Sequence, residues 1–162
     1  LGHRRIAFIS PPLYLMFAEH RLAGYQRALE ESGLGFDPSL VVEGDLSQSS
    51  GYRMMGRLLD LGNPPSAVVC GNDLMALGAI RAAQERGIVV GRDVAIVGFD
   101  DIPLAEHSHP PLTTVHQPIY EIGKRVSGMV IQIVEGKELV EHQVILQPEL
   151  VIRESSGIKE RR

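Results

Sequence analysis

The stretch that decides the fold is Val94-Ala95-Ile96-Val97-Gly98-Phe99-Asp100-Asp101, which continues through Pro110-Pro111-Leu112-Thr113-Thr114-Val115-His116-Gln117-Pro118. Its first part is a short apolar run rich in branched residues, which is typical of a strand buried on both faces. A glycine and two carboxylates end that run. Because open parallel sheets bind ligands where their strands end, Asp100 is the first candidate for a ligand contact.

Strand and helix patterns alternate on the N-terminal side of this stretch. Apolar runs predict strands over residues 6–10, 40–43 and 67–70, and helical periodicity predicts helices over 19–32, 51–60 and 74–86. Proline, glycine, asparagine and aspartate residues mark the short connections between them. Short strand–helix–strand units form right-handed crossovers, so the sequence predicts an α/β fold with a doubly wound parallel sheet.

On the C-terminal side the pattern is less regular. Residues 102–109 predict a short helix or loop, and 119–135 a helix with one strongly apolar side. Two further strands are predicted over 143–146 and 150–153. The polar tail from Glu154 onward is expected to be frayed.

Composition narrows the possible functions. The 162 residues are 44% hydrophobic and 22% charged, with a net charge of -4, so no basic face for nucleic acid is expected on this segment. Cys70, the single cysteine, lies in an apolar run and is expected to be a small core residue. The spacing of His107, His109 and His116 matches no metal-ligand signature, and no metal site is predicted. No apolar run is long enough to cross a bilayer.

Three polar residues each allow a structural and a functional interpretation. A cation near a helix start, such as Arg21, is not favoured by the helix dipole; it either serves a polar ligand or is a surface arginine, solvated or paired with Glu19. Asp73 is explained as the N-cap of the helix over 74–86. Asn72 lies at the same strand-end rim as Asp100, where its amide could bind a polar ligand.

The helix over 74–86 carries apolar residues on more than one side. Leu77, Ile80 and Arg81 point partly away from the side expected to face the sheet. Either a partner subunit covers this surplus or the chain buries the helix on two sides itself.

Enzyme signatures are missing from the sequence. No glycine-rich phosphate loop follows a predicted strand, and the sequence holds no Gly-x-Ser-x-Gly elbow. We therefore expect no catalytic residues and no cofactor, although a doubly wound enzyme with Asp100 or Asp101 as nucleophile or base is an alternative.

Seven short motifs occur in order along nearly the whole chain, and together they resemble the effector-binding core of the lactose-repressor and galactose-repressor family of bacterial transcription regulators. They are Gly2-His3-Arg4-Arg5-Ile6-Ala7, Arg21 with Gly24-Tyr25, Gly44-Asp45, Ser66-Ala67 with Asn72-Asp73 and Ala76-Leu77-Gly78-Ala79, Val97-Gly98-Phe99-Asp100-Asp101, Pro111-Leu112-Thr113-Thr114-Val115, and Leu150-Val151-Ile152-Arg153-Glu154-Ser155.

The resemblance implies a periplasmic-binding-protein-like core of two lobes that holds a sugar or sugar derivative in the cleft between them. By this match Arg21, Asn72, Asp100 and Gln117 bind sugar hydroxyls. The position after Gly44-Asp45, often aromatic in the family, is Leu46. Stacking on a sugar ring would then be lost or taken over by Tyr14 or Phe17.

The same resemblance implies how the chain is divided. Residues 1–117 are expected to form the C-terminal lobe, 118–147 a segment of the N-terminal lobe, and 148–162 a returning strand and tail. DNA is expected to be bound only through a helix-turn-helix domain that this chain lacks. The apolar side of the helix over 119–135 would be covered by another chain, or by the C-terminal lobe in a position unusual for the family. A homodimer is expected, with Leu77, Ile80 and Arg81 in its interface.

The function implied is that of a cytoplasmic regulator whose DNA binding responds allosterically to a sugar. A periplasmic sugar-binding receptor of a transport system, which shares the fold, is the alternative. The Leu112 to Val115 run and the Leu150 to Ser155 ending favour the regulator.

Overall fold

A computed structural model of the chain describes residues 1–139 and 141–157. Its centre is a four-stranded parallel sheet in the order β2-β1-β3-β4. The strands are β1 (Ile6–Ser10), β2 (Val41–Glu43), β3 (Ala67–Cys70) and β4 (Ala95–Val97). In the register, Phe8 lies between Val41 and Val69. The predicted α/β fold with a parallel sheet is confirmed.

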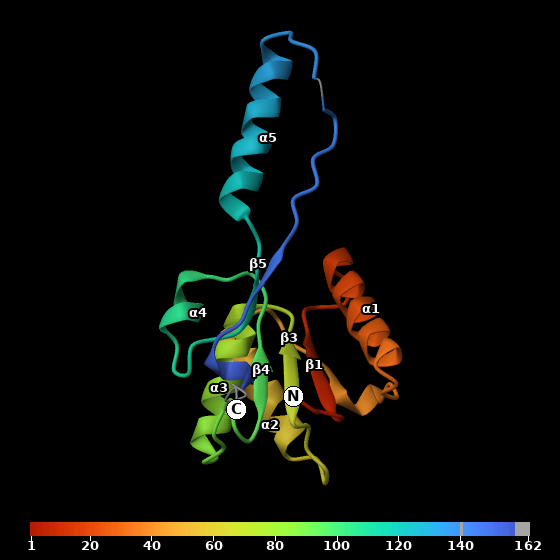
Figure 1. Cartoon of the computed structure of the whole chain (residues 1–162), viewed down its shortest axis with the longest axis vertical. Coiled ribbons are helices and arrows are strands. Elements are labelled where there is room, and N and C mark those ends of the chain that lie inside the picture. Colours follow the sequence, from red (N-terminus) through yellow and green to blue (C-terminus); the bar gives the residue numbers. More distant parts are fainter. Residues whose placement is uncertain (140, 158–162) are drawn as a thin grey trace.

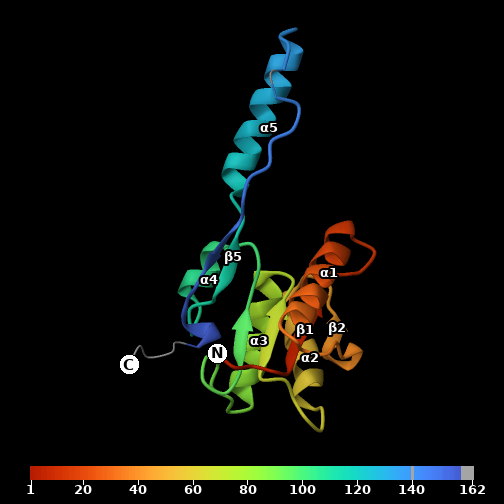
Figure 2. The ribbon, with the colours of Figure 1, turned by 45° about the vertical axis from the view of Figure 1, so that its right-hand side comes forward.

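Helices cover both faces of this sheet, as the two views show (Figures 1 and 2). On one face, helix α1 (Met16–Glu31) packs Tyr25 and Leu29 against Phe8, and the Phe8 and Tyr25 rings stack at 5.3 Å. On the other face, α2 (Gln48–Leu59) and α3 (Asp73–Glu85) bury the larger core cluster with Ile9 and Ile96. The fold is therefore doubly wound, as predicted.

Helices α2 and α3 touch through their backbones. A Cβ atom on Gly78 would lie 1.9 Å from the carbonyl oxygen of Gln48, and one on Gly51 would lie 2.0 Å from that of Met75. Because α3 contacts the sheet on one side and α2 on another, the chain itself buries Ile80, which is 4% exposed. The structure thus does not place Ile80 on a surface that a partner could reach, contrary to expectation.

The first residue of α3 differs from the prediction. Asn72, not Asp73, is the N-cap, because its Oδ1 accepts from the Met75 amide at 2.9 Å. Asp73 lies inside the helix and is fully buried, where its carboxylate accepts from the Thr114 hydroxyl (2.6 Å) and the Ile102 amide (2.9 Å). Either side chain can cap a helix. Asp73 instead bonds to Thr114, a buried residue distant in the chain, and Asn72 is the cap.

Two other helices also begin earlier than predicted. Helix α1 begins at Met16 rather than at residue 19, so Arg21 lies in its second turn. Helix α2 begins at Gln48 rather than at residue 51, because Ser47 caps it by accepting from the Ser50 amide. A 3-10 helix, η1 (Pro38–Leu40), precedes β2.

Two antiparallel strands, β5 (Thr114–His116) and β6 (Glu149–Val151), lead away from the sheet toward helix α5 (Ile119–Val134), while the short α4 (Pro103–His107) lies beside them (Figure 1). None of the described residues of α5 is buried, and Val126 and Ile133 are 54% and 58% exposed. The part of the chain around the parallel sheet does not cover α5, so the expectation that it would is wrong.

Two C-terminal predictions are also wrong. Residues 143–146 form no strand, because no neighbouring strand among the described residues offers them a partner edge. Residues Glu154–Ser156 form a 3-10 helix, η2, rather than a frayed tail. The Ser155 hydroxyl is fully buried, donates to the Ile96 carbonyl at 2.6 Å and accepts from the Thr113 amide at 2.8 Å. The remaining tail, 158–162, lies outside the described residues.

Within the described residues, the structure has no helix with the length and apolar character needed to span a membrane. Cys70 is buried and unpaired, and burial raises the pKa of its thiol. Its predicted role as a core residue is confirmed.

Candidate functional site

The carboxyl ends of all four parallel strands meet at the edge of the sheet that faces β5 and α5 (Figure 1). Arg21 reaches this edge from α1, with a side chain that is only 19% exposed. Its guanidinium donates to the Gly71 carbonyl, and it stacks 3.8 Å from the Phe99 ring centroid and 4.8 Å from that of Phe17. The alternative of a solvated arginine or one paired with Glu19 is therefore wrong.

Asp100 faces Arg21 from the loop after β4. Its Oδ1 accepts from Nε2 of Gln117 at 2.6 Å and lies 3.8 Å from Nη2 of Arg21. Gln117 follows β5 directly, so three elements contribute to one cluster. Three of the predicted contacts, Arg21, Asp100 and Gln117, are thus brought together.

The attraction between Arg21 and Asp100 does not fully compensate for the water that burial removes from each of them. Burial lowers the pKa of Arg21 despite the opposing attraction of Asp100. Burial likewise raises the pKa of Asp100, against the lowering effects of the Gln117 hydrogen bond and of Arg21. At 3.8 Å the attraction does not offset the lost hydration of either group. Polar groups of a ligand could restore that solvation.

Asn72 lies beside the cluster with most of its hydrogen bonds already made. It is 8% exposed, its Oδ1 caps α3, and its Nδ2 donates to the Leu46 carbonyl at 3.0 Å. One amide hydrogen and one oxygen lone pair are left for a ligand. Leu46 has a φ of +69° and packs its partly buried side chain against the core, so Asn72 holds this strained loop in place.

The predicted aromatic residues differ in placement. Phe17 is 40% exposed and lies against Arg21, whereas Tyr14 is 85% exposed in the turn before α1. The sequence interpretation missed Phe99, whose ring supports Arg21. Its signal was available, because it is the aromatic residue between Gly98 and Asp100.

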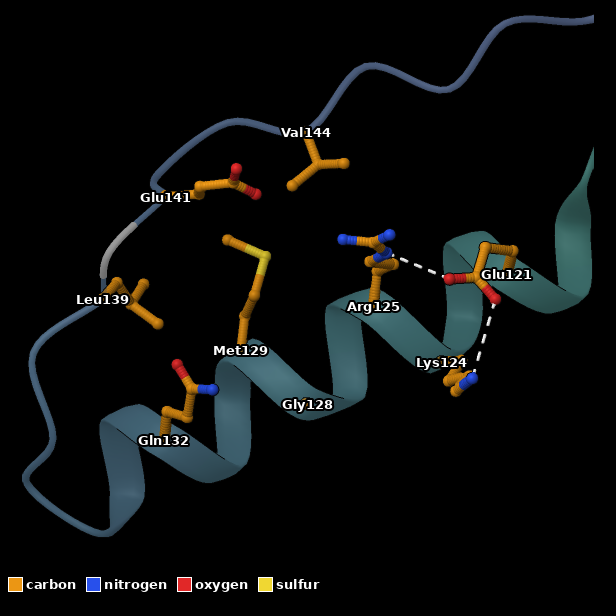
Figure 3. Close-up of a pocket in the computed structure, with 9 residues that line it drawn as sticks. All are labelled: Glu121, Lys124, Arg125, Gly128, Met129, Gln132, Leu139, Glu141 and Val144. Carbon is orange, nitrogen blue, oxygen red and sulfur yellow. Dashed lines mark hydrogen bonds and ion pairs between the residues drawn. The ribbon is translucent and has the colours of Figure 1, made fainter.

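One hollow is lined partly by Arg21 and Phe99, and another lies away from this cluster, beside α5. One, of about 560 Å³, extends below Arg21 between α1 and the sheet and is mostly apolar, with Tyr25, Val97 and Phe99 in its wall. The other, of about 480 Å³, lies between α5 and the chain that follows it (Figure 3). There Glu121 already pairs with Arg125 at 3.0 Å and with Lys124 at 3.9 Å. No residue of the Arg21 cluster lines this second hollow, so it is not a candidate for the same site.

A second group of polar residues adjoins the cluster, because Asp101 and His116 are the chain neighbours of Asp100 and Gln117. Its contacts were not predicted from the sequence. Asp101 contacts Nη2 of Arg153 at 2.9 Å and Nδ1 of His116 at 2.9 Å. Asp73, 41 residues from Thr114 in the sequence, accepts that residue's hydroxyl proton. No local sequence pattern predicts such contacts, because each joins segments far apart in the chain.

Residues 1–156 match the family model described as a periplasmic binding protein-like domain. The chain belongs to this family. Within it, the chain corresponds to the effector-binding portion of regulators of the lactose-repressor type. The periplasmic binding protein-like fold explains the site: its strand ends form one wall of the region where Arg21 and Asp100 meet.

Individual relatives agree with this assignment. The HTH-type transcriptional repressor CytR of Escherichia coli is 39% identical over 155 residues, which cover 96% of this chain and 46% of that protein. A structure of the transcriptional regulator CelR with cellobiose superposes with a TM-score of 0.88 at 38% identity, covering 95% of this chain and 47% of that one. For a dimeric Lac repressor the TM-score is 0.88 at 36% identity, covering 97% and 57%. This chain spans about half the length of its curated relatives.

Proposed function

We propose that this periplasmic binding protein-like chain is the effector-sensing part of a bacterial transcription regulator, and that its effector is a sugar or sugar derivative. The observation that carries the proposal is the under-solvated pair of Arg21 and Asp100 at the ends of the parallel strands. Relatives named as transcriptional repressors support it, as does the CelR complex with cellobiose.

Each residue of the cluster has a distinct role in this proposal. Arg21 donates from a planar fork and Asp100 accepts, which suits two neighbouring hydroxyls of a sugar. Gln117 and Asn72 supply amide groups with spare hydrogen-bonding capacity. Phe17 offers an exposed ring for the apolar face of a sugar, in place of an aromatic residue at Leu46, and Tyr14 lies close by in the sequence, in the turn before α1.

The division into lobes is also proposed. Residues 1–117 form the C-terminal lobe, and 118–147 belong to an N-terminal lobe that would close the other side of the site. Residues 148–162 return to the C-terminal lobe. The exposed apolar side of α5 supports this division, because isolated helices rarely expose so many large side chains. Effector binding would shift the lobes and change the DNA affinity of a domain outside this chain.

The alternatives have less support. A periplasmic sugar receptor shares the fold, but the relatives named are transcriptional repressors. Those relatives are not enzymes, which supports the absence of a catalytic role here. A regulator of transcription would act in the cytoplasm.

The proposal predicts that Asp100→Asn abolishes most sugar binding. A panel of monosaccharides and disaccharides that includes cellobiose is titrated against the isotope-labelled chain, because NMR detects weak binding. We expect shifts centred on Arg21, Phe99 and Gln117, and a loss of affinity of about tenfold or more in the variant, since one charge-assisted hydrogen bond contributes about 1.5–3 kcal/mol. Shifts confined to other regions, or equal affinity in the variant, would contradict the proposal.

Stability measured on the same variant separates binding from folding. Because the pKa of Asp100 is raised in the folded protein, the folded state holds a proton more tightly than the unfolded state. The unfolding free energy therefore falls as the pH rises from the ordinary aspartate pKa of the unfolded chain, and the full cost of ionised Asp100 is reached above the raised folded pKa; at low pH, where both states are protonated, this cost is absent. Asp100→Asn should gain up to about 1 kcal/mol of unfolding free energy near pH 7 and nothing near pH 3. Loss of stability at neutral pH would indicate that the binding defect is a folding defect.

We also propose a homodimer that uses the outer side of α3, where Arg81 is exposed and Leu77 is partly buried. Arg81→Glu is expected to weaken the dimer by about tenfold, a common effect for an arginine in an interface core. Sedimentation velocity across a concentration series measures it. Arg27→Glu on α1 is the matched control, because Arg27–Glu31 and Arg81–Glu85 are both exposed i,i+4 pairs. Equal behaviour of the two variants would refute this interface.

A further inference from the structure

The loop that carries Asp100 has an unfavourable backbone. Asp100 and Asp101 have φ angles of +119° and +57°, a region that side-chain-bearing residues rarely adopt. Such residues cost roughly 1–3 kcal/mol each and persist only when the surrounding structure holds them. The loop therefore needs contacts that keep it in this conformation.

Asp101 makes those contacts, and its side chain is only 16% exposed. Oδ1 lies 2.9 Å from Nη2 of Arg153, and Oδ2 lies 2.9 Å from Nδ1 of His116. Arg153 is itself tied down, because its Nη1 donates to the Leu112 carbonyl at 2.8 Å. One carboxylate thus joins the loop after β4, strand β5 and the segment after β6.

The same contacts set the register around Asp100. The Asp100 amide donates to the Val115 carbonyl at 2.9 Å. The two residues that follow Val115 bond to the two aspartates. His116 pairs with Asp101, and Gln117 donates to Asp100. Because these pairs are adjacent, the Asp101–His116 contact brings Gln117 to the Asp100 carboxylate.

We infer that Asp101, clamped by Arg153 and His116, is a positioning residue that holds the Asp100 carboxylate toward Arg21. Asp101 contacts neither Arg21 nor Gln117 through its own side-chain hydrogen bonds; it acts through the loop that it anchors. This inference rests on the proposed function, because it gives that site its geometry. The clamp also links the site to both strands that lead to α5.

Arg153→Met tests the inference without any ligand. If the clamp only contributes charge, removing a nearby cation raises the pKa of Asp100. If the clamp positions the loop, its loss lets Asp100 turn into solvent, and the pKa falls toward the ordinary aspartate value because burial raised it. Carboxyl carbon NMR during a pH titration measures this sign directly.

Amide hydrogen exchange gives a second readout. We expect at least about tenfold faster exchange of the Asp100 amide in Arg153→Met, and also in Asp101→Asn, which keeps the side-chain size and tolerates the left-handed backbone. Asp101→Asn decides the matter if Arg153→Met does not fold. Asp60→Asn is the control, because it removes an exposed aspartate–arginine pair with Arg86 elsewhere.

A raised or unchanged pKa of Asp100 in Arg153→Met, or unchanged exchange in Asp101→Asn, overturns the inference. Neither readout requires sugar binding. Failure of the sugar panel would therefore count against the proposed function alone.

Discussion

Replacement of Asp73 by alanine is expected to destabilise the chain by about 3–5 kcal/mol, since one buried and one partly buried hydrogen-bond donor lose their acceptor at about 1–3 kcal/mol each and the lost side chain leaves a void. The donors are the Ile102 amide and the Thr114 hydroxyl, 2.9 and 2.6 Å from the carboxylate. Asp73 is fully buried, so water does not replace the lost acceptor. Urea unfolding at neutral pH measures the change.

Asp60→Ala serves as control for the Asp73 variant. Its carboxylate pairs with Arg86 but is 69% exposed, so its loss should change stability by less than about 1 kcal/mol. A similar loss for both variants would show that burial of Asp73 contributes nothing. Because Asp73 also raises the pKa of Asp100, that pKa should fall in Asp73→Ala.

The second large effect is expected for Gly78→Ala. The new Cβ would lie 1.9 Å from the Gln48 carbonyl oxygen and 2.7 Å from the Tyr52 amide nitrogen, both backbone atoms of α2. Backbone cannot move aside as the end of a flexible side chain can, so the two helices must separate. We expect a loss of about 2–4 kcal/mol, at the upper end of overpacking effects.

Gly24→Ala is the matched control, because both glycines lie in helix interiors. A Cβ on Gly24 would meet nothing within 4 Å. Alanine there should stabilise the chain by up to about 1 kcal/mol through its higher helix propensity. Thermal unfolding of the two variants should therefore shift in opposite directions, and a stabilised Gly78→Ala would disprove the close helix crossing.

The fold was largely predictable because its signals are local. Apolar runs such as Ala67–Cys70 and the turn residues after them predict both the strands and the edge at which ligands bind. The prediction of a strand over 143–146 was wrong because it, too, used only local signals. A strand needs a partner edge, and periodicity in one segment says nothing about whether such an edge exists.

For the candidate site, the sequence indicated which residues lie at the strand ends but not what they contact. Arg21, Asp100 and Gln117 could be named, yet spacing alone favoured a surface arginine at Arg21, and its stacking on Phe99 is visible only in the structure. Ser155, in a tail expected to be frayed, proved to be fully buried between Ile96 and Thr113.

The sequence by itself determined the layers, the order of elements and the rim where polar residues gather, because hydrophobic periodicity and turn chemistry act over a few neighbouring residues. Only the tertiary structure decided what each of three carboxylates does: Asp73 is buried, Asp101 anchors the loop, and Asp100 faces Arg21. The physical reason is that a charged group is placed by its partners. The partners of Asp73 and Asp101, Thr114 and Arg153, come from distant parts of the chain that meet only after folding.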